Sequence, residues 1–156
     1  MTKKMRIYVD TSVIGGCFDE EFQKSSNRLI EHARCGRLVL LVSDVVVREL
    51  EKAPEFVHAI LNTVPEFSIE RIILDDEALD LRDAYLAANI LGPKWLDDMS
   101  HVAIATVSRA DAIVSWNFKH IVRLDKMKAY NQVNLLNNYG ILTIISPMEV
   151  ITDEDD

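Results

Sequence analysis

The feature that most constrains this chain is a regular alternation of short apolar segments with longer segments of helical periodicity. Five apolar segments, expected to be strands, fall at residues 6–9, 38–42, 68–74, 112–115 and 141–145. The second of these contains no polar residue, which indicates a strand buried on both faces. Strands that alternate with helices predict a parallel sheet covered on both faces, and therefore an α/β fold. In such sheets a ligand site lies beyond the carboxyl ends of the strands, where the strand order reverses.

Helices are expected between the strands, and several have a recognisable start or stop. A helix at about 25–34 ends before Gly36, Ser43 is a favourable N-cap for the next, and Pro54 suits the first position of a third. Further helices are expected at about 78–88, 96–108 and 125–138. Because no repeat, linker or internal charge block divides the chain, we expect one domain over residues 1–150 and an acidic tail at 151–156.

Composition excludes several classes of protein. With 49% hydrophobic residues in 156, the chain can build a core, which excludes a disordered protein. The net charge of −8, half of it from the four acids at the C-terminus, argues against a broad electrostatic nucleic-acid binder without excluding nucleic acid. Two cysteines without a CxxC motif favour the reducing cytoplasm. No apolar run approaches the length of a membrane span or a signal peptide, so we expect no membrane association.

Three acids occupy positions that the expected fold brings toward one edge of the sheet. Asp10 directly follows the first strand, although it could equally cap the next helix. Glu49 lies on an apolar helix face, or at its edge where its head reaches water. Asp98 opens a helix of small apolar residues, and Asp97 is its rival as the inward-facing acid.

Ser115 and Asn117 follow the fourth strand and reach the same edge of the sheet. Carboxylates gathered there would repel one another and raise their own pKa values. A divalent cation removes this conflict, and oxygen ligands suit Mg²⁺ or Mn²⁺ better than zinc.

These residues, in this order, resemble the PIN domain, whose bacterial members include VapC-like toxin ribonucleases of toxin–antitoxin pairs. The resemblance extends over about residues 6–150. It rests on Tyr8 to Val13, Arg48 to Leu50, Asp98 in its small-residue helix, and Val114 to His120.

The resemblance implies a three-layer PIN-like fold with a central parallel sheet of about five strands, and metal-dependent cleavage of RNA, often by a homodimer. Asp10, Glu49 and Asp98 match the family's first three acidic positions, and Thr11 and Ser12 match the polar residues after the first. Asp10 and Asp98 would hold the cation, and Glu49 would ligate it or orient the attacking water.

Asn117 stands where many members of the family carry a fourth acid. A neutral amide can still ligate the metal or orient a metal-bound water, so Asn117 is kept as a candidate catalytic residue. Because it contributes no charge, a second metal site is left in doubt. The resemblance also implies a partner, a small antitoxin protein that would block the acidic cleft.

Basic and aromatic residues near the fourth strand are candidates for RNA contacts. Lys119, His120 and Arg123 are expected to hold backbone phosphates, although a structural hydrogen bond is the commoner role for a histidine placed like His120. Trp116 could stack on a base, but packing in the core or at its rim is the commoner use of such an aromatic.

Other classes fit the sequence less well. A phosphatase of the haloacid type would carry an acid at the position of Ser12, and a phospho-receiver domain would need an acidic pair where Asp10 stands alone. The glycine-rich phosphate-binding motifs GxGxxG and GxxxxGK do not occur. The remaining alternative is a catalytically weak PIN-like module that binds RNA or protein, which the neutral Asn117 and the overall acidity would favour.

Overall fold

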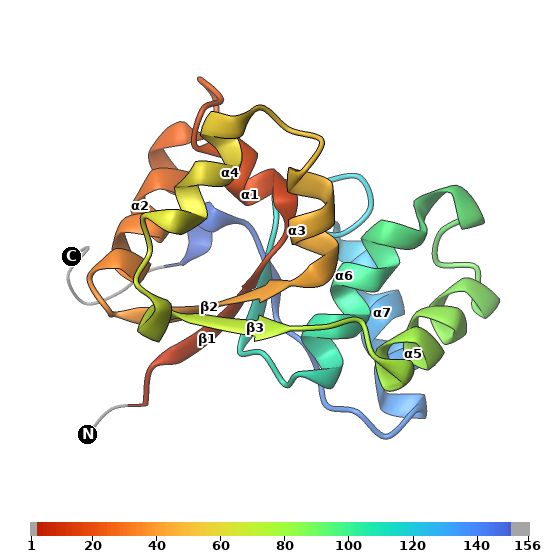
Figure 1. The fold of residues 1–156 in the computed structure, drawn as a ribbon. Helices are drawn as coiled ribbons and strands as arrows, with labels where there is room; N and C mark the ends of the chain where they lie inside the picture. The colour runs from red at the N-terminus through yellow and green to blue at the C-terminus, as the bar shows by residue number, and fades with distance from the viewer. Residues whose placement is uncertain (1–2, 151–156) are drawn as a thin grey trace.

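A computed structural model describes residues 3–150, and the predicted acidic tail at 151–156 lies outside them. The sheet contains five parallel strands in the order β3-β2-β1-β4-β5 (Figure 1). All five expected strands are present, although the third and fifth are shorter than predicted. Their bounds are β1 Met5–Val9, β2 Leu38–Ser43, β3 Ile69–Ile72, β4 Ala112–Val114 and β5 Ile144–Ile145.

The helices follow the predicted pattern, with one addition directly after Asp10. Their bounds are α1 Thr11–Gly16, α2 Gln23–Arg34, α3 Asp44–Leu50, α4 Glu55–Asn62, α5 Asp76–Ala87, α6 Leu96–Val107 and α7 Leu124–Leu136. Ser43 caps α3 as expected, because its hydroxyl accepts a hydrogen bond from the Val46 amide. Pro54 is the N-cap of α4 instead of its first residue. None of the helices in residues 3–150 is long and apolar enough to cross a membrane.

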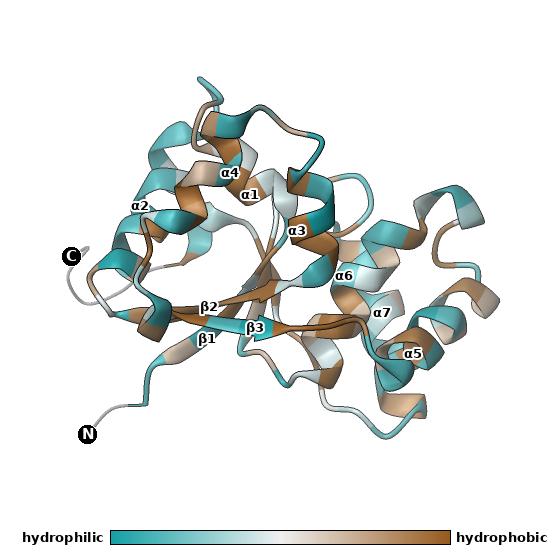
Figure 2. Ribbon diagram, in the orientation of Figure 1, coloured by the Kyte–Doolittle hydropathy of each residue, from teal (hydrophilic) through white to brown (hydrophobic). Residues whose placement is uncertain are grey.

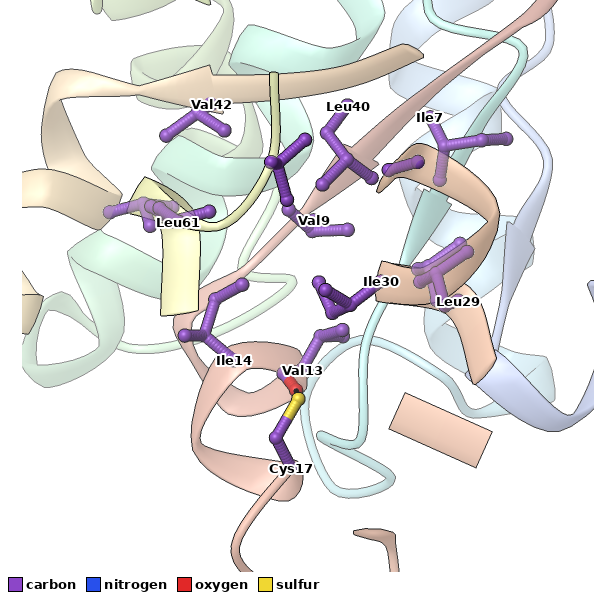
Figure 3. Close-up of a cluster of buried hydrophobic side chains, with 14 of the residues drawn as sticks. Ile7, Val9, Val13, Ile14, Cys17, Leu29, Ile30, Leu40, Val42 and Leu61 are labelled. Atoms are coloured by element: carbon purple, nitrogen blue, oxygen red, sulfur yellow. Dashed lines mark hydrogen bonds between the residues drawn. The ribbon is translucent and has the colours of Figure 1, made fainter. Parts of the chain in front are cut away.

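Helices cover both faces of the sheet, as the alternation predicted. Side chains of β1 alternate between the two faces of the sheet, so Ile7 and Val9 pack with α1, α2 and α4 (Figure 3). Tyr8 packs on the other face, with α5, α6 and α7. Apolar residues of the helices turn toward the sheet and hydrophilic residues are frequent on their outer sides (Figure 2). The result is a three-layer α/β fold with a core on each face of the sheet.

The strand order places β1 at the centre of the sheet, with β2 on one side and β4 on the other. The chain therefore extends the sheet to one side of β1 with β2 and β3, and then returns to the other side with β4 and β5. The carboxyl ends of β1 and β4 flank this point of reversal. Asp10 follows β1 and Ser115 follows β4, so both predicted site residues meet at this point.

Candidate active site

Asp10 lies at the carboxyl end of the central strand and is almost fully buried, with 4% of its surface exposed. It occupies the N-cap position of α1, yet its side chain does not cap the helix. Its two carboxylate oxygens instead accept hydrogen bonds from the Ser12 and Ser115 hydroxyls, both at 2.5 Å. The capping interpretation is therefore wrong for the side chain, and two predicted supporting residues hold this acid.

Glu49 projects from α3 and accepts two hydrogen bonds at Oε1. One comes from the Thr11 hydroxyl at 2.9 Å, and the other joins it to Nε2 of His101 in α6 at 2.6 Å. His101 is buried, with 2% of its surface exposed, and its Nδ1 lies 2.7 Å from the Tyr8 hydroxyl. That hydroxyl lies 2.7 Å from Oγ of Ser43. A continuous chain of hydrogen bonds thus runs from the core to Glu49.

Asp98 projects from the first turn of α6, and its Oδ2 bonds Nδ1 of His120 at 2.8 Å. Its side chain is 22% exposed, against 55% for the side chain of neighbouring Asp97. Asp97 forms an exposed ion pair with Arg48 at 3.3 Å. This difference favours Asp98 over Asp97 as the inward-facing acid.

The three acids share one electrostatic environment, centred on His101. Burial alone would lower the pKa of His101, but the hydrogen bond with Glu49 and the charges of Asp10, Glu49 and Asp98 raise it overall. Burial raises the pKa of Asp10, because the charge of His101 and the hydrogen bonds from Ser115 and Ser12 only partly offset the lost hydration. For Glu49 burial acts in the same direction, yet His101, Thr11 and Arg48 together lower its pKa.

The segment after β4 is held by its own polar side chains. Ser115 donates to Asp10 and accepts from the Asn117 amide at 2.9 Å. Oδ1 of Asn117 accepts from the amides of Lys119 and His120, at 3.2 and 2.9 Å. The carboxamide oxygen of Asn117 thus stabilises the turn that carries Lys119 and His120.

The donor set of the site fits a hard divalent cation in its chemistry, since it offers three carboxylates and several hydroxyls. Glu49 and Asp98 each bond a histidine through one oxygen, and the other oxygen has no hydrogen-bond partner in residues 3–150. As the side chains stand, no three His, Cys, Asp or Glu residues of this range converge closely enough to hold a metal ion. The predicted metal ligands thus keep one oxygen available on Glu49 and one on Asp98, while both oxygens of Asp10 carry serine hydroxyls.

The predicted RNA-contact residues have different surroundings. Trp116 is a core residue, stacked on Phe22 with 4.2 Å between ring centroids and donating to Ser26, so the packing interpretation is confirmed. Arg123 is exposed and forms a two-point ion pair with Asp125 at 2.6 and 2.8 Å. His120 is buried against Asp98, as the structural interpretation expected, and Lys119 is exposed.

Sequence reasoning missed two residues of the site, His101 and Trp95. His101 lies one helical turn after Asp98 on an otherwise apolar helix, and that placement was the available signal. Trp95 lines a hollow together with Glu49 and Asp98, but its sequence neighbourhood gives no such signal.

An open parallel sheet with this strand order, helices on both faces and acids at its point of reversal defines the PIN-like class of α/β folds. Comparison with solved structures gives the same result. A chain of VapBC2 from Rickettsia felis, crystallised with a DNA fragment from its promoter, is 15% identical with a TM-score of 0.57, and the match covers 91% of this chain and 98% of that one. A chain of DNA-bound VapBC from Salmonella typhimurium is 16% identical with a TM-score of 0.55, and the match covers 92% of this chain and 98% of that one.

VapC20 from Mycobacterium tuberculosis, a toxin that cleaves the sarcin–ricin loop, is 12% identical with a TM-score of 0.52, over 73% of this chain and 92% of that one. Neither a protein-family model nor a curated protein sequence matches the chain. At these identities the likeness is one of fold, and it confirms the PIN-like fold that the sequence resemblance implied.

Proposed function

We propose that this protein is a metal-dependent endoribonuclease and the toxin of a toxin–antitoxin pair. The observation that carries the proposal is the placement of three acids near the carboxyl end of the central strand. Asp10 is buried there, the hydroxyl of the adjacent Thr11 bonds Glu49, and Glu49 and Asp98 line one hollow. Acids that follow β1 and lie on α3 and α6 have no structural need to gather at one edge of the sheet, because burying charge is costly. A site for cation-assisted chemistry on a polyanion accounts for the arrangement, and the VapC-like fold supports it.

Asp10, Glu49 and Asp98 would hold the cation, Mg²⁺ or Mn²⁺. When bound, such an ion lowers the pKa of water and neutralises charge that develops on phosphoryl oxygens. Ser12 and Ser115 fix the carboxylate of Asp10, while Thr11 and His101 fix that of Glu49. With Oε1 held in this way, Oε2 of Glu49 would be the oxygen that either ligates the cation or orients the water for attack on phosphorus, in line with the leaving oxygen.

The direct test is incubation of the purified protein with RNA and Mg²⁺ or Mn²⁺, with and without EDTA. Cleavage should require the metal, and Asp10→Asn should abolish it while the protein stays folded by circular dichroism. Asp98→Asn and Asp97→Asn form a matched pair of neighbours, of which only the first should lose cleavage. Undiminished cleavage by purified Asp10→Asn would refute the catalytic assignment.

A second candidate is a PIN-like module that binds RNA or protein without efficient catalysis. Two observations favour it: no metal-holding group of three is formed by residues 3–150 as they stand, and the oxygen of Asn117 is occupied by its own turn. The same assay separates the two candidates, because this module would bind RNA equally well with EDTA and would release no products with Mg²⁺ or Mn²⁺.

As a toxin, the protein would bind a small antitoxin protein, act in the cytoplasm and form a homodimer. Structural neighbours that are complexes, such as VapBC from Salmonella typhimurium, support the antitoxin. Expression of this chain alone should slow growth, and co-expression of a small protein encoded beside it should restore growth. Equal growth in both cultures would refute the toxin role and leave the nuclease chemistry intact, and light scattering that shows a monomer at high concentration would refute the dimer.

A further inference from the structure

An open hollow of about 460 Å³ lies beside the candidate active site, within the size range of small-molecule sites. Glu49, Asp97 and Asp98 line it, and Trp95 joins them from the short helical turn before α6. The ring of His120 packs against the indole with 4.2 Å between centroids, and the same histidine bonds Asp98. Trp95 is therefore fixed directly beside a candidate catalytic acid.

Two lysines accompany the indole of Trp95. Nζ of Lys94 lies 5.1 Å from the ring centroid and Nζ of Lys119 lies 6.0 Å from it. Neither ammonium group forms an ion pair with another of residues 3–150. Because both lysines are exposed, both ammonium groups are available to an anionic ligand.

We propose that Trp95, Lys94 and Lys119 form a nucleotide subsite for single-stranded RNA, in which a base stacks on the indole and the lysines bind the flanking phosphates. The subsite rests on the ribonuclease function proposed above and identifies where the substrate is held. Single-stranded nucleic acid matches the indole and the two lysines beside it, because its bases are uncharged and its negative charges lie on either side of each base.

Two other ligands fit the hollow less well. A duplex keeps its bases stacked on one another and cannot offer a face to Trp95. A basic protein segment would be attracted to Glu49 and Asp98, whereas Asp97 is already paired with Arg48. The same segment would be repelled by Lys94, which lines the hollow, and by Lys119 beside the indole. The combination of a partly exposed aromatic with unpaired cations favours the nucleotide.

Intrinsic fluorescence tests the subsite without any cleavage, since Trp95 and Trp116 are the two tryptophans of the chain. Trp116 is buried on Phe22, so a ligand in the hollow changes the emission of Trp95. The full-length Asp10→Asn protein in EDTA is titrated with a short single-stranded oligoribonucleotide. We expect the RNA to quench the emission, and a duplex of the same sequence to leave it unchanged.

Variants assign the binding to individual residues, with affinity measured by the anisotropy of labelled RNA. Trp95→Ala should weaken binding about 5- to 150-fold, and Trp95→Phe should restore part of the loss because it keeps a stacking face. Lys94→Gln and Lys119→Gln should each lower the slope of log Kd against log salt by about 0.7. Lys24→Gln on α2, an exposed lysine on the opposite side of the sheet, is the matched control and should change neither quantity.

The outcomes separate the subsite from the nuclease. Metal-dependent cleavage by the wild-type protein, without quenching and with unchanged affinity in Trp95→Phe and both lysine variants, would overturn the subsite and leave the ribonuclease intact. Quenching that depends on Trp95, in a wild-type protein that never cleaves RNA, would support the subsite and overturn catalysis. Quenching by an arginine-containing peptide but not by RNA would assign the hollow to a protein partner and overturn the subsite.

Discussion

The two faces of the sheet are built differently. The face covered by α1, α2 and α4 is packed mostly with aliphatic side chains, among them Ile30 and Leu40 (Figure 3). The face covered by α5, α6 and α7 contains Tyr8, Tyr85 and Tyr130, all fully buried. Each of these three hydroxyls is hydrogen-bonded within the core.

The polar face supports the acids. The Tyr8 hydroxyl bonds His101, which bonds Glu49. The Tyr130 hydroxyl donates to the main-chain oxygen of His120 at 3.0 Å, and the ring of His120 bonds Asp98. Two acids are thus each fixed through a histidine by a tyrosine of the core. Both faces contain a buried apolar core, and the polar face also contains hydrogen bonds that orient the candidate site.

The largest expected effect is on the free energy of unfolding, when a large side chain is removed from the aliphatic face. Ile30→Ala should lower the free energy of unfolding by about 2–5 kcal/mol, because Ile30 is fully buried and the neighbours refill the space only in part. Urea denaturation measures this change. RNA cleavage per folded molecule should stay at the wild-type level, and a marked fall would show that the aliphatic face also shapes the site.

Removing one hydroxyl from the polar face should affect both stability and activity. Tyr8→Phe leaves Ser43 and His101 without their shared partner, which should cost about 1–3 kcal/mol of unfolding free energy. Cleavage should fall about 10-fold, because the ring that holds Glu49 is no longer fixed.

Tyr85→Phe is the matched control for this prediction. The Tyr85 hydroxyl bonds Asn134 and Thr106, and none of these residues contacts the acids. Comparable destabilisation without loss of cleavage is expected. Equal loss of cleavage in both variants would show that stability alone, and not the orientation of His101, sets the rate.

The smallest expected effect concerns the two thiols. Burial in the aliphatic face raises the pKa of Cys17 to about 11, so at pH 8 it remains a protonated thiol, whereas Cys35 is exposed. One thiol per molecule should therefore react rapidly with a disulfide reagent at pH 8, and the second only on unfolding. Rapid reaction of both would reveal that the aliphatic face opens readily.

Much of the fold follows from the sequence because its signals are local. The apolar run of β2 and the cap at Ser43 depend on neighbours along the chain, and both were predicted. Strand β5 is shorter than predicted because only Ile144 and Ile145 pair with β4. The apolar residues at 141 and 142 precede this paired segment. The short helix α1 was not expected as an element of its own, since its six residues carry no periodic pattern.

The candidate site was only partly predictable. Asp10, Glu49 and Asp98 could be placed because parallel topology brings the ends of separate elements to one edge. The hydrogen-bond partners of these acids could not be predicted, because the residues that bond are far apart in the sequence. His101 is 52 residues from Glu49 and 93 residues from Tyr8. The position of Trp95 also could not be predicted from its sequence neighbours. Trp116 follows a strand and is packed in the core, whereas Trp95 lies on a short turn and lines the hollow.

The strand order has a consequence for protein synthesis. Asp10 lies on the central strand, but the strand that completes its surroundings, β4, and the hydroxyl of Ser115 leave the ribosome only after two thirds of the chain. Until then β1 has an open edge, and Asp10 lacks one of its two serine partners. A nascent chain therefore carries Asp10 and Asp98 before it contains Ser115 and His120, which bond them in the folded protein. In the proposed ribonuclease, the hydrogen-bond partners of Asp10 and Asp98 would be complete only once β4 and the turn that follows it have been synthesised.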